Sequence, residues 1–180
     1  VYPQGALEGA WDGTSFKGAL RIDPQETKGE KQSAEGAFKP LAMQALIEAS
    51  AQRLSLLKIK ITPSDRSDSG TLIEGDAVVE FGTQSMARLD LKSPRINLDT
   101  LLGAGAMQQW RDGGFLSVAN QVLAHTPAKL IADYKLNVSV LTSGGQAVND
   151  VRLTGSLQKE ALRVHEFVAE LPGRSIGIFD

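Results

Sequence analysis

The side chains that could carry acid–base or metal chemistry in this chain are few and lie far apart. The chain has two histidines, His125 and His165, and no cysteine. A helical zinc site needs histidines a few residues apart and a thiolate site needs cysteine, so neither is predicted. His125 precedes Pro127 at the end of a predicted helix, where the helix dipole favours an imidazolium. His165 falls where a strand pattern changes parity, and we interpret both histidines as structural residues.

Other short motifs resemble functional sites only in composition. "SDRSDSG" at residues 64–70 has two aspartates but lacks the alternating oxygen ligands and the terminal Glu of a calcium loop. The glycine-rich stretches at 103–107 and 112–114 do not follow the strand–turn–helix order of a phosphate loop. No G-x-S-x-G elbow occurs, and Ser175 has no evident base. The sequence therefore predicts a protein that is not an enzyme and that uses no metal or cofactor.

The charge and composition of the chain limit the kinds of partner that it can bind. The 180 residues carry a formal net charge of −2 with a pI near 5.7, which argues against a nucleic-acid surface. No apolar run approaches the roughly 20 residues that span a bilayer. The chain starts at Val1 and stops within an apolar run at 175–180 that begins like a strand. We therefore expect a single domain, residues 1–180, that is a fragment of a longer chain.

Alternation of apolar and polar residues is the dominant pattern, and it predicts half-buried strands. It runs through residues 7–11, 14–23, 73–81, 132–140 and 151–157, and Asp12-Gly13 is suited to a tight hairpin turn. The alternation changes parity near Leu56–Leu57 and near His165–Glu166. One extra residue in a strand has this effect, so we expect β-bulges at both places, which bend a sheet.

One segment, residues 98–126, has apolar spacings of three and four instead. Leu98, Leu101 and Leu102 fit a short helix with Asn97 as N-cap, and residues 115–123 fit a second helix that ends before Pro127. This helical insertion would be a lid or a simple cover. The predicted fold is mainly β: an open, curved antiparallel sheet, a half-barrel or groove, with two short helices covering one face or end.

Two stretches resemble the AsmA-like family of Gram-negative envelope proteins. The first is "IEGDAVVEFGTQSMARLDLKSPRINLDTLL" at 73–102, whose "INLDTLL" resembles the family's "-IDLD-LL" step from strand into helix. The second is 138–180, with "DVRL" at 150–153 and "LPG" at 171–173. The likeness extends from about residue 33 onward, and its motifs are apolar patterns whose order is more specific than any one of them. Asn97 stands where the family often has Asp.

The resemblance implies a non-enzymatic, periplasmic function. Relatives are anchored in the inner membrane by an N-terminal helix, which this sequence does not contain, and take part in outer-membrane assembly and homeostasis. Their long, curved sheets have an apolar groove associated with phospholipid transport between membranes. The resemblance thus implies a phospholipid or other acyl-chain ligand. The groove candidates are Trp11, Phe16, Ile73, Val79, Phe81, Tyr134, Leu136, Val138, Leu153 and Phe167.

Alternation alone is equally consistent with a packed core and with an open groove. A second interpretation is a structural or protein-interaction β module whose open edges pair with neighbouring segments of the parent chain or form an edge-strand dimer. A third, an enzymatic or carbohydrate-binding β-sandwich, is disfavoured because aromatic residues are only 6% of the chain and no clustered carboxylate pair occurs.

Overall fold

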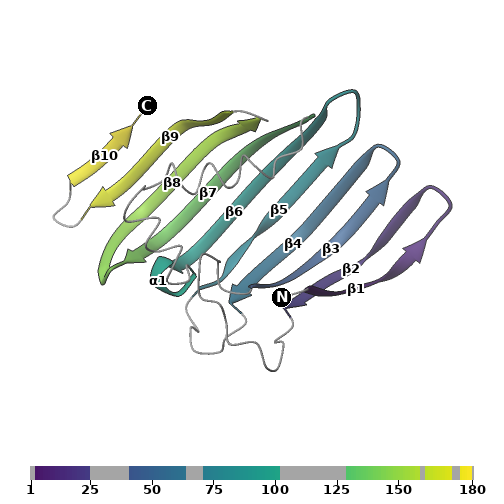
Figure 1. Ribbon diagram of the computed structural model, residues 1–180, viewed down its shortest axis with the longest axis horizontal. Coiled ribbons are helices and arrows are strands. Elements are labelled where there is room, and N and C mark those ends of the chain that lie inside the picture. The colour runs from purple at the N-terminus through teal and green to yellow at the C-terminus, as the bar shows by residue number, and fades with distance from the viewer. Residues whose placement is uncertain are drawn as a thin grey trace.

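Ten strands of one sheet make up almost all of the described structure (Figure 1). The computed structural model describes residues 3–24, 41–63, 71–101, 129–158, 161–171 and 175–179. The strands are β1 (Pro3–Trp11), β2 (Ser15–Pro24), β3 (Leu41–Ser50), β4 (Arg53–Pro63), β5 (Ile73–Glu80), β6 (Ser85–Asn97), β7 (Leu130–Ser143), β8 (Gln146–Gln158), β9 (Ala161–Leu171) and β10 (Ser175–Phe179). The mainly β, open-sheet prediction is confirmed.

The strands lie in the sheet in their chain order, with β1 and β10 at opposite ends (Figure 1). The predicted strand near the C-terminus joins the same sheet, because β10 pairs with β9. Neighbours are antiparallel except β6 and β7, which are parallel, so the sheet is mixed and the predicted antiparallel arrangement is wrong at this pair. Parallel strands need a long crossover, and the 102–128 segment between them supplies that length.

The described helix is α1 (Leu98–Leu101), a single turn that follows β6 directly. Asn97 caps it as predicted, since its Oδ1 accepts a hydrogen bond from the Asp99 backbone N at 3.0 Å. The expectation of two short helices is wrong for the described residues, which hold this one. The second predicted helix lies outside them, as do His125, the 64–70 loop and the glycine-rich stretches.

Both predicted bulges are confirmed. In β4, Leu56 pairs with Ala77 and Ile59 with Gly75, so Leu57 and Lys58 stand opposite a single residue, Asp76. Lys58 has a φ of 52°, and its backbone N donates to Asp76 Oδ1 at 2.8 Å. These contacts fix the position of the bulge on the sheet.

The second predicted bulge is at His165. Gly155 pairs with Val164 and Thr154 with Glu166, which leaves His165 as the extra residue of β9. A third bulge, which the sequence pattern did not indicate, lies in β8 at Asp150, where φ is 48°. Bulges increase local twist and bend the strand that carries them.

The first hairpin has the predicted turn. Gly13 has a φ of 99°, which glycine adopts at little cost. The Asp12 carboxylate accepts hydrogen bonds through Oδ1 from the backbone N of Thr14 at 2.9 Å and of Ser15 at 2.8 Å. These backbone hydrogen bonds, with those of the two hydroxyls, hold the pKa of Asp12 far below its usual range.

Candidate binding face

The register places uncharged side chains on one face of the sheet, in four ranks that cross it. Cross-strand partners point to the same side of a sheet, so each rank follows from the pairing. The ranks are Trp11, Phe16, Ala49, Leu54, Val79, Ala87, Ala132, Leu157 and Leu162; Gly9, Gly18, Ile47, Leu56, Ala77, Leu89, Tyr134, Gly155 and Val164; Leu7, Leu20, Ala45, Ile59, Gly75, Leu91, Leu136, Leu153 and Phe167; and Gly5, Ile22, Met43, Ile61, Ile73, Ser93, Val138, Val151 and Ala169. We call this set the apolar face.

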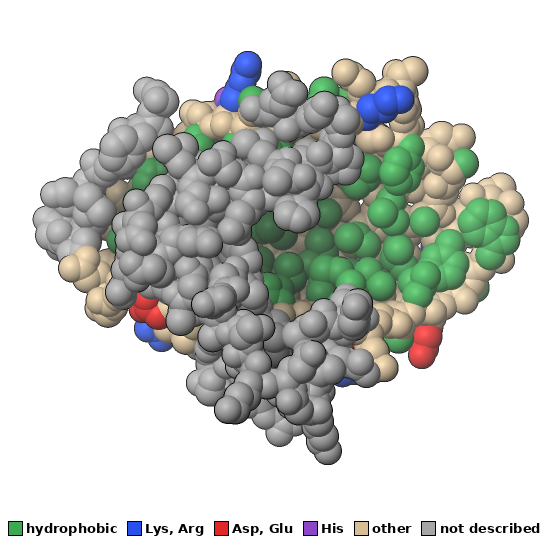
Figure 2. Space-filling view, in the orientation of Figure 1, with side chains coloured by type: hydrophobic (Ala, Val, Ile, Leu, Met, Phe, Trp, Pro, Cys, Tyr) green, Lys and Arg blue, Asp and Glu red, His purple; other side chains and the backbone are tan. Residues whose placement is uncertain are grey.

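Exposure along the apolar face is uneven. In Figure 2, hydrophobic side chains gather over the part of the sheet where β1 to β5 run. Trp11 is 62% exposed and Leu7 55% exposed at the β1 end. Toward the other end, Val138 is 2% exposed and forms a buried cluster with Ile96, Val151 and Ala169. The side chains of α1 contribute to this cluster through Leu98 and Leu101. The face is therefore open near β1 and packed near β7 and β8.

All the predicted groove residues except one lie on the apolar face, although Val138 belongs to the buried cluster and Leu136 and Phe167 pack against it. Trp11, Phe16, Val79, Tyr134, Leu136, Leu153, Phe167, Ile73 and Val138 lie in the four ranks. Phe81 does not, because β5 ends at Glu80 and the chain turns there. The backbone N of Phe81 donates to Gln52 O at 2.8 Å, and its side chain is 48% exposed. The predicted strand, which ran to Phe81, was therefore one residue too long.

Two aromatic rings on the apolar face cover glycines of their own or of a neighbouring strand. A Cβ on Gly18 would lie 2.8 Å from Cζ of Phe16, and one on Gly9 would lie 2.5 Å from the same atom. Tyr134 covers Gly155 in the same way. In the sequence these pairs were indicated only by a glycine inside an alternating strand. Such a glycine indicates that another group comes close to the backbone, but not which residue provides it.

Tyr134 also carries a polar group into the apolar face. Its hydroxyl donates to the backbone O of Arg163 at 3.2 Å, beyond the glycine that its ring covers. Burial raises the pKa of Tyr134, so the phenol stays protonated and remains a donor at neutral pH. The ring thereby links β7, β8 and β9 at the level of the His165 bulge.

The opposite face is charged, with opposite signs side by side. Lys17 and Glu48 approach to 3.6 Å and Lys60 and Glu74 to 3.7 Å. Such exposed pairs contribute little stability each, but the charges keep this face in water. The two faces of the sheet thus differ in what they can contact.

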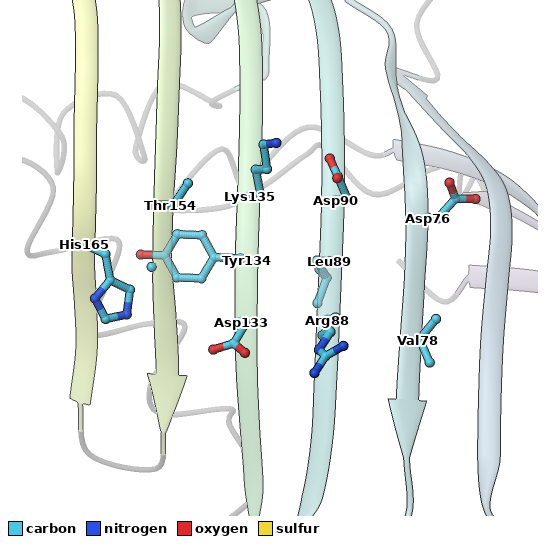
Figure 3. A pocket seen from close by; sticks show the side chains of 11 residues that line it. Asp76, Val78, Arg88, Leu89, Asp90, Asp133, Tyr134, Lys135, Thr154 and His165 are labelled. Carbon is cyan, nitrogen blue, oxygen red and sulfur yellow. The ribbon is translucent and has the colours of Figure 1, made fainter.

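A shallow groove of about 460 Å³ lies on the charged face, and Figure 3 shows its side chains on β5 to β9. It includes Arg88 and Lys135 but also Asp76, Asp90 and Asp133, so it has no single sign of charge. Among the described residues no group of three metal-ligating side chains occurs.

His165 and Ser156 form the nearest approach to a catalytic pair. His165 Nε2 lies 3.1 Å from Ser156 Oγ on the charged face. A serine nucleophile also needs its histidine to be oriented by a third group, and within the described ranges no carboxylate hydrogen-bonds to this ring. The pair closes the bulge of β9 onto β8, in agreement with the structural interpretation of His165.

Comparison with protein-family models, curated proteins and solved structures found no match to this chain. In the part of the chain that the structure describes, no helix is long and apolar enough to cross a membrane.

Proposed function

We propose that this chain is a non-enzymatic, lipid-binding segment of an AsmA-like periplasmic protein, whose parent is anchored in the inner membrane and serves outer-membrane homeostasis. Its role is to shield the acyl chains of phospholipids on their way between membranes. The observation that carries the proposal is the apolar face, four ranks that cross β1 to β9 without a charged side chain.

The dimensions of the apolar face suit a ligand recognised by its hydrocarbon tail. Strands about 4.8 Å apart and same-face residues about 6.7 Å apart give the open part of the face, β1 to β5, a floor of roughly 19 Å by 20 Å. Each CH₂ group removed from water contributes about 0.8 kcal/mol, so affinity grows with the length of chain covered. The bulges at Lys58 and His165 bend the sheet, and we propose that the bend makes this floor a groove.

Two adjacent valines of β5 provide the test, because they lie on opposite faces. Val79 pairs with Leu54 and Ala87 on the apolar face, whereas Val78 pairs with Arg88 on the charged face. In Val79→Glu, a bound acyl chain would bury an unpaired carboxylate, which costs several kcal/mol. In Val78→Glu, the new carboxylate stays in water beside a guanidinium.

The experiment is native mass spectrometry of the purified protein, followed by titration with a fluorescent phospholipid. We expect co-purified phospholipid in the wild type and in Val78→Glu, and at least about 100-fold weaker binding in Val79→Glu. Circular dichroism establishes that both variants are folded. A wild type free of lipid that also ignores the fluorescent phospholipid would refute the proposal, as would equal loss in the two variants.

The second candidate function is a structural module that pairs through its sheet edges. It is favoured by β1, which among the described strands pairs with β2 alone and carries the exposed Leu7. An edge strand presents unpaired N–H and C=O groups to another chain. The Asp12 N to Ser15 O hydrogen bond and the register direct the N–H groups of Ala6 and Glu8 toward β2 and those of Gly5 and Leu7 outward. Proline at Gly5 or Leu7 would therefore block that pairing, so a dimer that persists in both variants would exclude the β1 edge as its interface.

A further inference from the structure

Three described turns lie along the same side of the sheet, where the strands end. Large apolar side chains are exposed on and beside them. The turns are residues 12–14, 51–52 and 81–84, which connect β1 to β2, β3 to β4 and β5 to β6 (Figure 1). Because all six strands are antiparallel in chain order, alternate turns fall at the same edge. The hydrogen bond from Phe81 N to Gln52 O joins two of them directly. We call the three turns and the strand residues that flank them the turn edge.

Large apolar side chains are exposed along the turn edge. Trp11, the last residue of β1, is 62% exposed, and Phe81 in the third turn is 48% exposed. Met86, the second residue of β6, is 44% exposed. Exposed turn residues are commonly polar or charged, so two aromatic rings and a methionine along one edge indicate a surface that something else covers.

The charges at the turn edge show which kind of partner fits. Asp12 is the only charged residue within the three turns, and the flanking strand ends add Glu80 and Arg53. Lys129 belongs to the same edge, since its O accepts a hydrogen bond from Ser85 N. Among the described residues of the turn edge, these two acidic and two basic side chains give a formal net charge of zero. An edge with tryptophan and phenylalanine and no net charge matches the interfacial zone of a bilayer, where aromatic side chains partition among headgroups.

We propose that the turn edge docks on a phospholipid bilayer, with Trp11 and Phe81 inserted at the level of the headgroups. The inference rests on the proposed lipid-binding function, for which it supplies the contact with the donor or acceptor membrane. Trp11 belongs to both surfaces, because it is also the first residue of a rank of the apolar face. An acyl chain can therefore pass from the bilayer past Trp11 onto the open β1 end of the apolar face, whose ranks hold no charged side chain.

The fluorescence of Trp11 provides the direct test. The chain has two tryptophans, so Trp110→Phe leaves Trp11 as the only one. With phosphatidylcholine vesicles, we expect the emission of Trp11 to shift to shorter wavelength and to be quenched by brominated acyl chains. Because the edge has no net charge, 0.5 M salt (about a 4 Å screening length) should leave the effect unchanged. Emission that stays unshifted and unquenched would overturn the proposal.

Vesicle flotation of the otherwise unaltered protein gives an independent measurement. We expect Trp11→Ser and Phe81→Ser each to weaken vesicle binding by roughly tenfold. The matched control is Leu46→Ser, because Leu46 is 43% exposed but lies in the middle of β3. Equal loss in Leu46→Ser would overturn the proposal.

The two proposals fail in different ways. A wild type that co-purifies with phospholipid but does not float with vesicles would refute docking and leave lipid binding intact. A wild type that floats but holds no lipid, with Val79→Glu floating equally well, would support docking and refute lipid binding.

Discussion

Lys58 provides a sharp test of the fold, because its backbone conformation is unfavourable for a lysine. At a φ of 52° it occupies the left-handed region, which costs an L-residue roughly 1–2 kcal/mol. Glycine removes this cost but loses about 0.5–1 kcal/mol more conformational entropy on folding. The hydrogen bond from the backbone N to Asp76 is kept in Lys58→Gly. The net expectation is a gain of about 0.5–1 kcal/mol in the free energy of unfolding.

The matched control is Lys60→Gly, which changes the same residue type two positions along β4. Lys60 has ordinary strand geometry and pairs with Glu74 at 3.7 Å, so glycine there loses strand propensity and a weak ion pair. We expect a loss of about 1 kcal/mol from these two effects. The two substitutions should therefore shift stability in opposite directions, by about 2 kcal/mol in total.

Urea unfolding followed by circular dichroism measures both free energies, and thermal unfolding gives a second reading. A gain of about 1 kcal/mol raises the Tm of a chain of this size by roughly 2–4 °C. If Lys58→Gly were as destabilising as Lys60→Gly, Lys58 would be an ordinary strand residue. The bulge, and the parity change on which its prediction was based, would then be misplaced.

Three further changes test contacts that join distant segments. Tyr134→Phe removes the hydrogen bond to Arg163 O and should cost about 1 kcal/mol in urea unfolding while its ring stays in place. Asp99→Ala removes the carboxylate that accepts the Gly144 backbone N through both oxygens, at 2.8 and 3.0 Å, and should cost about 1–2 kcal/mol, whereas Asp99→Asn should cost less. Asp12→Ala should lower stability at neutral pH. Because folding lowers the pKa of Asp12, its contribution is complete above the unfolded value near 3.8 and is lost as the pH falls further, so the gap between wild type and variant should narrow in acid. A gap that widens in acid would contradict this assignment.

Local patterns in the sequence predicted the features that depend on neighbouring residues. Alternation identified β1, β2, β5, β7 and β8 and the face on which their side chains lie, because a strand has a period of two, whereas β3 and β6 were not predicted from it. The parity changes located the bulges at Lys58 and His165, since one extra residue reverses the pattern. Asn97 was recognised as a cap because its side chain bonds a backbone group two residues away.

Features set by distant contacts were not predicted. The parallel pairing of β6 with β7 was not predicted, because the alternation of a strand is the same in either direction. Asp99 was interpreted only as part of a strand-to-helix step. Its partner, Gly144, is 45 residues away, and nothing local to either residue indicates the other.

The composition of the apolar face supports the proposal of a flexible ligand over that of a second protein layer. Among the described residues, four of the eight buried apolar side chains are alanines, and no large side chain is below 2% exposure. A sheet that packs on another layer usually interdigitates large branched side chains across about 10 Å. Alanine and glycine give a low floor with few fixed holes, as at Ala45, Ala77 and Ala87. An acyl chain adapts to such a floor because it has many rotatable bonds and gains free energy in proportion to the area it covers.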